Sequence, residues 1–325
     1  MAGKPKVAFY WCASCGGCEE TVVDLGARVL DVVAAVDIVF WPCALDFKTR
    51  DVEALADGEL AVAFVNGAVR TDEQEHMARL LRRKAGCVIA LGACSGHGGI
   101  PALANLTSKR KIFDVSYHRS PTVVNPQGTE PKTKAVVDRY ELSLPAFHAT
   151  VRKLSDVVAV DYYLPGCPPT ADNLADAVQA ILSGKLPPTG AVLAPNKSLC
   201  GSCKRNDTKP EEGMAMPAIK RVVDVQLDPQ KCFLAQGVIC MGPATRDGCR
   251  ALCVEGNMPC TGCYGPTDGV KDQGAKMLAM LGGILEGDTP AAMQAKTARL
   301  NDPAGTFYRY TLAASLLGSE RKEAR

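Results

Sequence analysis

The sequence predicts an α/β fold with a parallel sheet, followed by a cysteine-rich domain of a different kind. Five short, almost continuously apolar runs alternate with helical patterns and turns over the first 165 residues. Such runs are typical of parallel strands that are covered on both faces. Beyond residue 195 the alternation stops, and eight of the fifteen cysteines fall within residues 200–263. We therefore expect two domains, residues 1–195 and residues 196–325.

Each expected element of the first domain follows from a local pattern. Apolar spacing predicts a helix over residues 22–32, and a threonine cap introduces each of two further helices, at 71–83 and 170–182. The apolar runs predict strands at residues 7–11, 36–41, 60–65, 87–91 and 157–164.

Residues 95–153 interrupt this order and are rich in Pro, Thr, Asn, Lys and Arg. We predict a long excursion with one amphipathic helix at residues 144–154. Excursions of this length are typically functional loops, interface loops or disordered segments.

The last sixty residues are expected to be mostly helical. Residues 274–285 are small and apolar, and a Thr-Pro pair at 289–290 has the pattern of a helix start. An Asp-Pro pair at 302–303 repeats that signal before a helix expected at 307–317. The charged residues 319–325 are expected to fray.

Composition excludes several classes of protein. The net charge is +2 with scattered Lys and Arg, which gives no nucleic-acid footprint. No apolar run approaches the roughly 20 residues of a membrane span. Because neither a signal peptide nor a twin-arginine signal is visible, we expect a cytoplasmic protein. Neither a G-x-G-x-x-G turn after the first strand nor a P-loop is present, which argues against a bound nucleotide or flavin.

The eight cysteines of residues 200–263 predict a scaffold for metal, because their segment holds too little apolar sequence to fold by burial alone. A disulfide framework suits short secreted chains and is disfavoured here. Zinc ribbons close two C-x-x-C pairs over a spacer of roughly 15–20 residues. The outer pairs here, at 200–203 and 260–263, are far apart with four cysteines between them. This spacing favours two iron-sulfur clusters with four thiolates each over zinc.

Four further cysteines follow predicted parallel strands. Cys15 and Cys18 follow the first strand, Cys94 the fourth and Cys167 the last. The carboxyl edge of such a sheet is where α/β proteins bind ligands. A flavin phosphate would use the same edge, but the first turn, CASCGGCEE, lacks a Ser/Thr-rich cradle. A third cluster with four thiolates therefore fits better.

Three motifs together resemble those of the small, electron-transferring subunit of nickel-iron hydrogenases. They are residues 15–20 (CGGCEE), 92–94 (GAC) and 165–169 (PGCPP), and the resemblance continues through the C-terminal cysteines. It implies a flavodoxin-like domain whose proximal cluster lies beside the nickel site of a separate large subunit. The nickel-binding motifs of that large subunit are missing from this sequence, so the hydrogen chemistry is expected in another polypeptide.

The resemblance also implies three ligand sets, each for one 4Fe-4S cluster. Where many family members have a His-x-x-Cys pair, this chain has a Cys-x-x-Cys pair at its distal site. A cysteine also stands at position 253, where a proline is common and the medial cluster is a 3Fe type. These departures are similar to the cytoplasmic, F420-non-reducing (methyl-viologen-reducing) branch. The implied sets are Cys15, Cys18, Cys94 and Cys167 for the proximal cluster, Cys249, Cys253, Cys260 and Cys263 for the medial cluster, and Cys200, Cys203, Cys232 and Cys240 for the distal cluster.

The resemblance implies two partners, a nickel-iron large subunit and an iron-sulfur or flavin acceptor subunit. The acceptor is expected to belong to a heterodisulfide-reductase-type complex. Three alternatives stay open: an F420-reducing or NAD(P)-linked hydrogenase small subunit, a complex I-like cluster subunit, and a zinc scaffold.

The remaining candidates have simpler explanations. Cys87 begins a strand and is expected in the core. Cys12 and Cys43 follow the first two strands and could support or replace a ligand, as could Asp46, although core packing explains the two cysteines as well. His97 could hydrogen-bond a cluster sulfide or a partner, or be an ordinary loop histidine. Glu19 and Glu20 could relay protons, but acidic residues in a first helical turn need only the helix dipole to explain them.

Overall fold

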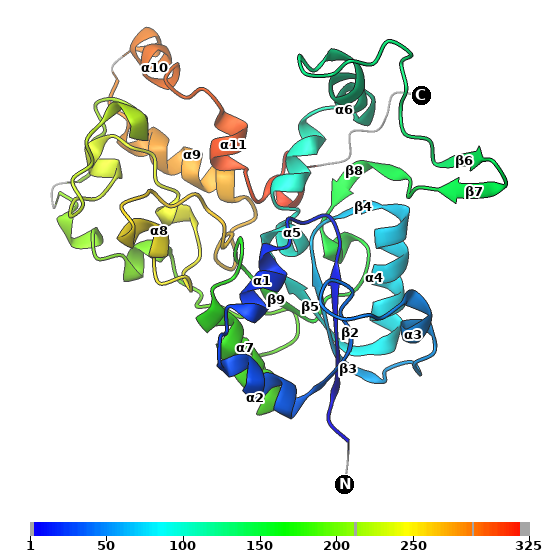
Figure 1. Cartoon of the computed structure of the whole chain (residues 1–325). Helices are drawn as coiled ribbons and strands as arrows, with labels where there is room; N and C mark the ends of the chain where they lie inside the picture. The colour runs from blue at the N-terminus through cyan, green and yellow to red at the C-terminus, as the bar shows by residue number, and fades with distance from the viewer. Residues whose placement is uncertain (1–2, 211–212, 288, 319–325) are drawn as a thin grey trace.

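The computed structural model, which describes residues 3–210, 213–287 and 289–318, confirms the parallel α/β architecture. Five strands form one sheet in the order β2-β1-β3-β5-β9, and every neighbouring pair is parallel (Figure 1). The order reverses at β1, so the carboxyl ends of β1 and β3 meet at a switch point of the type that binds ligands. The strands are β1 Lys6–Trp11, β2 Asp37–Phe40, β3 Leu60–Asn66, β5 Ala85–Leu91 and β9 Tyr162–Leu164.

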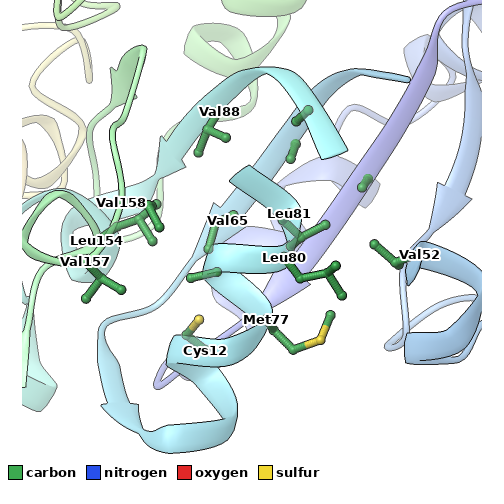
Figure 2. Close-up of a cluster of buried hydrophobic side chains, with 14 of the residues drawn as sticks. Cys12, Val52, Val65, Met77, Leu80, Leu81, Val88, Leu154, Val157 and Val158 are labelled. Atoms are coloured by element: carbon green, nitrogen blue, oxygen red, sulfur yellow. The ribbon is translucent and has the colours of Figure 1, made fainter. Parts of the chain in front are cut away.

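Helices cover both faces of this sheet. On one face, α3 (Thr49–Glu53) and α4 (Asp72–Lys84) pack Val52 and Leu81 against the strands (Figure 2). On the other face lie α1 (Gly17–Val23), α2 (Arg28–Ala35) and α7 (Ala171–Leu182). Threonine caps begin α4 and α7, as predicted. The continuous apolar strands are therefore buried from two sides.

Two predicted elements of this domain are shorter or interrupted. The single helix expected at 22–32 is divided into α1 and α2, because Gly26 between them has φ +59°. The strand expected from residue 157 begins only at Tyr162. Before Tyr162 this segment is attached to β5 through a side chain and not through strand pairing. Asp161 Oδ2 accepts hydrogen bonds from Val88 N at 2.7 Å and from Arg82 at 2.5 Å.

The excursion after β5 contains more regular structure than its sequence predicts. The helix expected at 144–154 is wrong: β8 (Phe147–Arg152) pairs antiparallel with β4 (Val69–Thr71). Asn105 fixes this strand by accepting from Val151 N and donating to Val151 O, both at 2.8 Å. The other elements are α5 Gly92–His97, a 3-10 helix Ile100–Leu106, α6 Lys109–Asp114, a π turn Val115–Arg119, β6 Lys134–Val137, β7 Tyr140–Ser143 and a 3-10 turn Leu154–Asp156.

The cysteine-rich part consists mainly of loops and 3-10 turns, with its own apolar core of residues such as Phe233 and Met277. The caps predicted for its later helices are present. The helix expected at 307–317 is wrong, because α11 ends at Phe307 and Asp272 accepts a hydrogen bond from Leu316 N at 3.0 Å. The predicted fraying of 319–325 lies outside the described residues, and the domain division at 195 stays a prediction. The helices are α8 Leu252–Glu255, α9 Gln273–Ile284, α10 Pro290–Thr297 and α11 Pro303–Phe307.

Candidate metal centres

Three turns carrying predicted ligands meet at the carboxyl edge of the sheet. Ala93 N donates to Gly166 O at 2.7 Å, which joins the turns that contain Cys94 and Cys167. Thr21 Oγ1 donates to Pro169 O at 3.1 Å and joins α1 to the same turn. The two central cysteines of the set, Cys18 and Cys94, are buried, Cys167 is half-buried and Cys15 is exposed.

Burial and mutual proximity raise the pKa of the Cys18, Cys94 and Cys167 thiols. Burial, followed by the neighbouring Cys94, Cys167 and Cys15, raises the pKa of Cys18. Burial and Cys167 raise the pKa of Cys94 to about 12, although Ile100 N–H donates to its sulfur. In the described part of the chain, no cationic side chain is among the causes that act on these three thiols. Iron supplies the positive charge that thiolates need when a cluster is bound.

Two glycines let the chain pass these sulfurs closely. Gly92 has φ +85°, and a Cβ on it would lie 2.3 Å from Cys18 Sγ. Gly99 has φ +59°, and its Cβ would lie 2.4 Å from Cys94 Sγ. Any other residue would push a sulfur away, so both glycines belong to the construction of this site.

The four cysteines predicted for the distal cluster line one small cavity, together with Arg205 and Lys209. Burial raises the pKa of Cys200, and the cation of Lys209 opposes this shift. Burial raises the pKa of Cys240 to about 12, although Gly242 N–H and Cys260 N–H both donate to its sulfur. Hydrogen bonds from backbone N–H groups to sulfur are among the contacts that tune protein-bound clusters.

The four cysteines predicted for the medial cluster also neighbour one another. Burial, followed by Cys249, raises the pKa of Cys263 to about 12, with Cys253 as a further cause. Burial raises the pKa of Cys260 well above its ordinary value, and Cys263 is among the further causes. Cys253, on α8, is exposed.

The three groups touch one another in a fixed sequence. Cys167 at the sheet edge neighbours Cys263, and both its backbone N–H and its sulfur affect the pKa of that thiol. Cys260 N in turn donates to Cys240 Sγ at 3.3 Å. The group of Cys249, Cys253, Cys260 and Cys263 therefore lies between the other two.

The donor set fits iron-sulfur clusters. All fifteen cysteines lie within the described residues and are free, and twelve of them form three neighbourhoods of four. In the part of the chain that the structure describes, no group of three or more His, Cys, Asp or Glu is arranged to hold a single metal ion. A cluster is held through thiolates on its several irons, so a shared neighbourhood is the relevant observation.

The other candidate residues, which belong to none of the three cysteine groups, lie in several different environments. Cys12 is buried in the core beneath α4 (Figure 2), and Cys87 is half-buried. Asp46 is exposed and pairs with Lys48. His97 packs on the loop after Cys263, where a Cβ on Gly265 would lie 2.3 Å from its Nε2.

Glu19 is buried, which its position in a first helical turn does not predict. Its carboxylate accepts hydrogen bonds from Trp41 Nε1 at 3.1 Å and from Asn66 Nδ2 at 3.0 Å. Partial burial, followed by the neighbouring Glu19, raises the pKa of the exposed Cys43 thiol to about 12. Glu20, which follows Glu19 in the sequence, is exposed. Trp41 and Asn66 lie at the ends of other strands and are distant from Glu19 in the sequence. The buried position of Glu19 is therefore recognisable only in the folded structure.

A parallel α/β sheet with three groups of four cysteines is typical of an iron-sulfur protein. Residues 15–181, slightly more than half of the chain, match the family model described as NADH ubiquinone oxidoreductase, 20 Kd subunit. The chain is 37% identical to a subunit of the F420-non-reducing hydrogenase of Methanothermobacter thermautotrophicus, over 98% of this chain and 97% of that protein. It is 34% identical to the iron-sulfur subunit of the F420-non-reducing hydrogenase of Archaeoglobus profundus, over 97% and 98%. The chain belongs to this family of hydrogenase iron-sulfur subunits.

Solved structures agree on the fold. A chain of the [NiFeSe] hydrogenase from Desulfovibrio vulgaris Hildenborough superimposes with a TM-score of 0.52 at 20% identity, covering 83% of this chain and 96% of that chain. Within the residues described, no helix is both long and apolar enough to cross a bilayer.

Proposed function

We propose that this chain carries electrons from hydrogen oxidation in a nickel-iron large subunit, through three 4Fe-4S clusters, to an acceptor subunit. The complex would be an oxidoreductase with hydrogen as its donor. The observation that carries the proposal is the spatial order of the three neighbouring cysteine groups, which runs from the sheet edge into the cysteine-rich part. When bound, the clusters supply one-electron redox sites. The residues of this chain hold them and surround their sulfurs with N–H donors.

The large subunit is proposed to dock at the carboxyl edge of the sheet. Cys15 is exposed there, and Trp11 and Ile100, which flank the two cysteine turns, are 39% and 50% exposed. Exposed apolar side chains beside a predicted cluster support a protein interface. The cytoplasm is the proposed compartment, since fifteen free thiols suit a reducing environment.

The acceptor is proposed to dock near the distal group, at the other end of the series. We propose an iron-sulfur or flavin subunit of a heterodisulfide-reductase-type complex, which the all-cysteine distal set favours by family resemblance. The relatives that align over nearly the whole chain are subunits of F420-non-reducing hydrogenases, which disfavours F420 as the acceptor. An acceptor that binds F420 or NAD(P) is the alternative. Purifying the native complex anaerobically and testing hydrogen-dependent reduction of viologen, deazaflavin and NAD distinguishes them.

Metal analysis tests the cluster proposal. Anaerobically purified, fully loaded protein should be brown and contain about twelve iron and about twelve sulfide per chain, from three four-iron clusters. Eight or fewer would remove one site from the proposal. Colourless protein with zinc would replace it with the scaffold alternative.

Replacing Cys253 by proline tests the medial set. We expect the medial cluster to become a 3Fe form and the chain to lose about one iron, because an exposed ligand is removed from one corner. Electron paramagnetic resonance reads the change directly, with the neighbouring Leu252→Ala as the matched control on the same short helix. An unchanged four-iron cluster in Cys253→Pro would mean that another residue is the fourth ligand.

A further inference from the structure

Arg205 is a buried cation beside the predicted distal cluster. It is only 6% exposed and lines the same cavity as Cys200, Cys203, Cys232 and Cys240. Its guanidinium stacks 4.3 Å from the centre of the Phe233 ring. A charge in such a place is costly unless an opposite charge or strong hydrogen bonds compensate it.

Among the described residues, the guanidinium of Arg205 donates hydrogen bonds to neutral oxygens only. Nη2 donates to Val254 O at 2.9 Å and to Asn257 Oδ1 at 3.0 Å. Nη1 makes two longer contacts, at 3.5 Å to Asp228 O and 3.4 Å to Lys231 O. These contacts tie three loops together, but none of them neutralises the charge.

Another buried arginine of the cysteine-rich part shows the contrast. Arg246 is 2% exposed and forms an ion pair with the carboxylate of Asp268. Across residues 3–210, 213–287 and 289–318, no carboxylate lies within ion-pair distance of Arg205. Among the described residues that line its cavity, the four cysteine sulfurs are the groups that can take up negative charge.

We propose that the cluster held by Cys200, Cys203, Cys232 and Cys240 is the counter-charge of Arg205, and that Arg205 raises the reduction potential of this cluster. The inference rests on the proposed function. Four thiolates give a bound cluster net negative charge, and its one-electron reduction adds one more. A fixed cation in the same cavity stabilises the reduced form more than the oxidised form, because net charge sets cluster potentials. Lys209, half-buried at the same cavity, acts in the same direction.

The test compares charge with shape at position 205 in the assembled complex. Redox titration followed by electron paramagnetic resonance should show Arg205→Gln lowering the midpoint potential of one cluster only. We expect the reduction equilibrium to weaken at least tenfold, which is about 59 mV for one electron. Arg205→Lys keeps the charge but loses the planar donor set, so its potential should stay close to that of the parent. Lys204→Met is the matched control, because this charge adjoins Cys203 but is 81% exposed and screened by solvent.

Each outcome of these measurements supports or rejects the proposed role of Arg205. Equal shifts in the Gln and Lys variants, or no shift in fully loaded Arg205→Gln, would overturn the proposal and leave Arg205 as a structural tie. If Arg205→Gln loses about four irons while Arg205→Lys keeps them, the counter-charge is supported by cluster retention. If both lose them, it is rejected. A parent protein without iron would refute the proposed function itself and is recognised before any variant is made.

Discussion

Replacing Cys203 by serine is expected to abolish electron delivery from hydrogen to the natural acceptor, while hydrogen-isotope exchange in the same complex continues. Cys203 belongs to the group at the far end of the series, which contacts the medial group where Cys260 N donates to Cys240 Sγ. In the proposed complex, isotope exchange would take place at the nickel site of the large subunit, which needs no exported electron. The measurement is exchange by mass spectrometry beside acceptor reduction, in complex whose subunit content is verified.

Cys87→Ser is the matched control for this substitution. Cys87 lies near the amino end of β5, at the opposite edge of the sheet from the predicted clusters. It should keep about twelve irons and both activities. Loss of exchange together with transfer in intact Cys203→Ser complex would place this group next to the nickel subunit and reverse the proposed order.

Replacing Gly92 by alanine is expected to remove the proximal cluster and, with it, all hydrogen-dependent dye reduction. The new methyl group would lie 2.3 Å from Cys18 Sγ, far inside contact distance, and the backbone there has φ +85°. That backbone conformation alone costs a residue with a side chain roughly 1–2 kcal/mol. We expect the loss of about four irons per chain, measured together with viologen reduction.

Gly96→Ala in the same helix α5 separates this effect from general damage. Its added methyl group meets Tyr163 Cδ1 at 3.8 Å, an ordinary contact, and its backbone needs no positive φ. This variant should keep its iron and its activity. Full iron content and normal dye reduction in Gly92→Ala would show that Cys18 does not hold a cluster in the position the structure gives it.

Local patterns predicted most of the sheet. Apolar runs located all five strands, and the cap residues of α4, α7, α10 and α11 were predicted because a cap acts on amides only a few residues away. The failures depend on distant partners. The segment 147–152 forms a strand because β4 and Asn105 pair with it, and nothing in its own sequence specifies those partners.

The same distinction applies to the candidate sites: local spacing predicted some of their features, and features that depend on tertiary contacts were missed. Cysteine spacing, with the family resemblance, predicted which thiols neighbour one another. It did not predict that Cys167 neighbours Cys263, because that contact joins two loops that are far apart in the sequence. Glu19 and Arg205 were missed as buried charges for a related reason. Charged residues in polar turns are normally exposed, and only tertiary contacts bury them.

The hairpin of β6 and β7 affects how the chain behaves before it joins a complex. It projects from the body of the molecule (Figure 1), and Val136, Val137, Tyr140 and Leu142 on it are all more than half exposed. A lone two-stranded hairpin is marginal in water, and its free edges are templates for unwanted pairing. Copies of the chain made in excess of their partners would therefore expose an apolar, aggregation-prone hairpin to one another. Balanced synthesis and prompt capture by a partner would protect this chain from aggregation and from proteolysis.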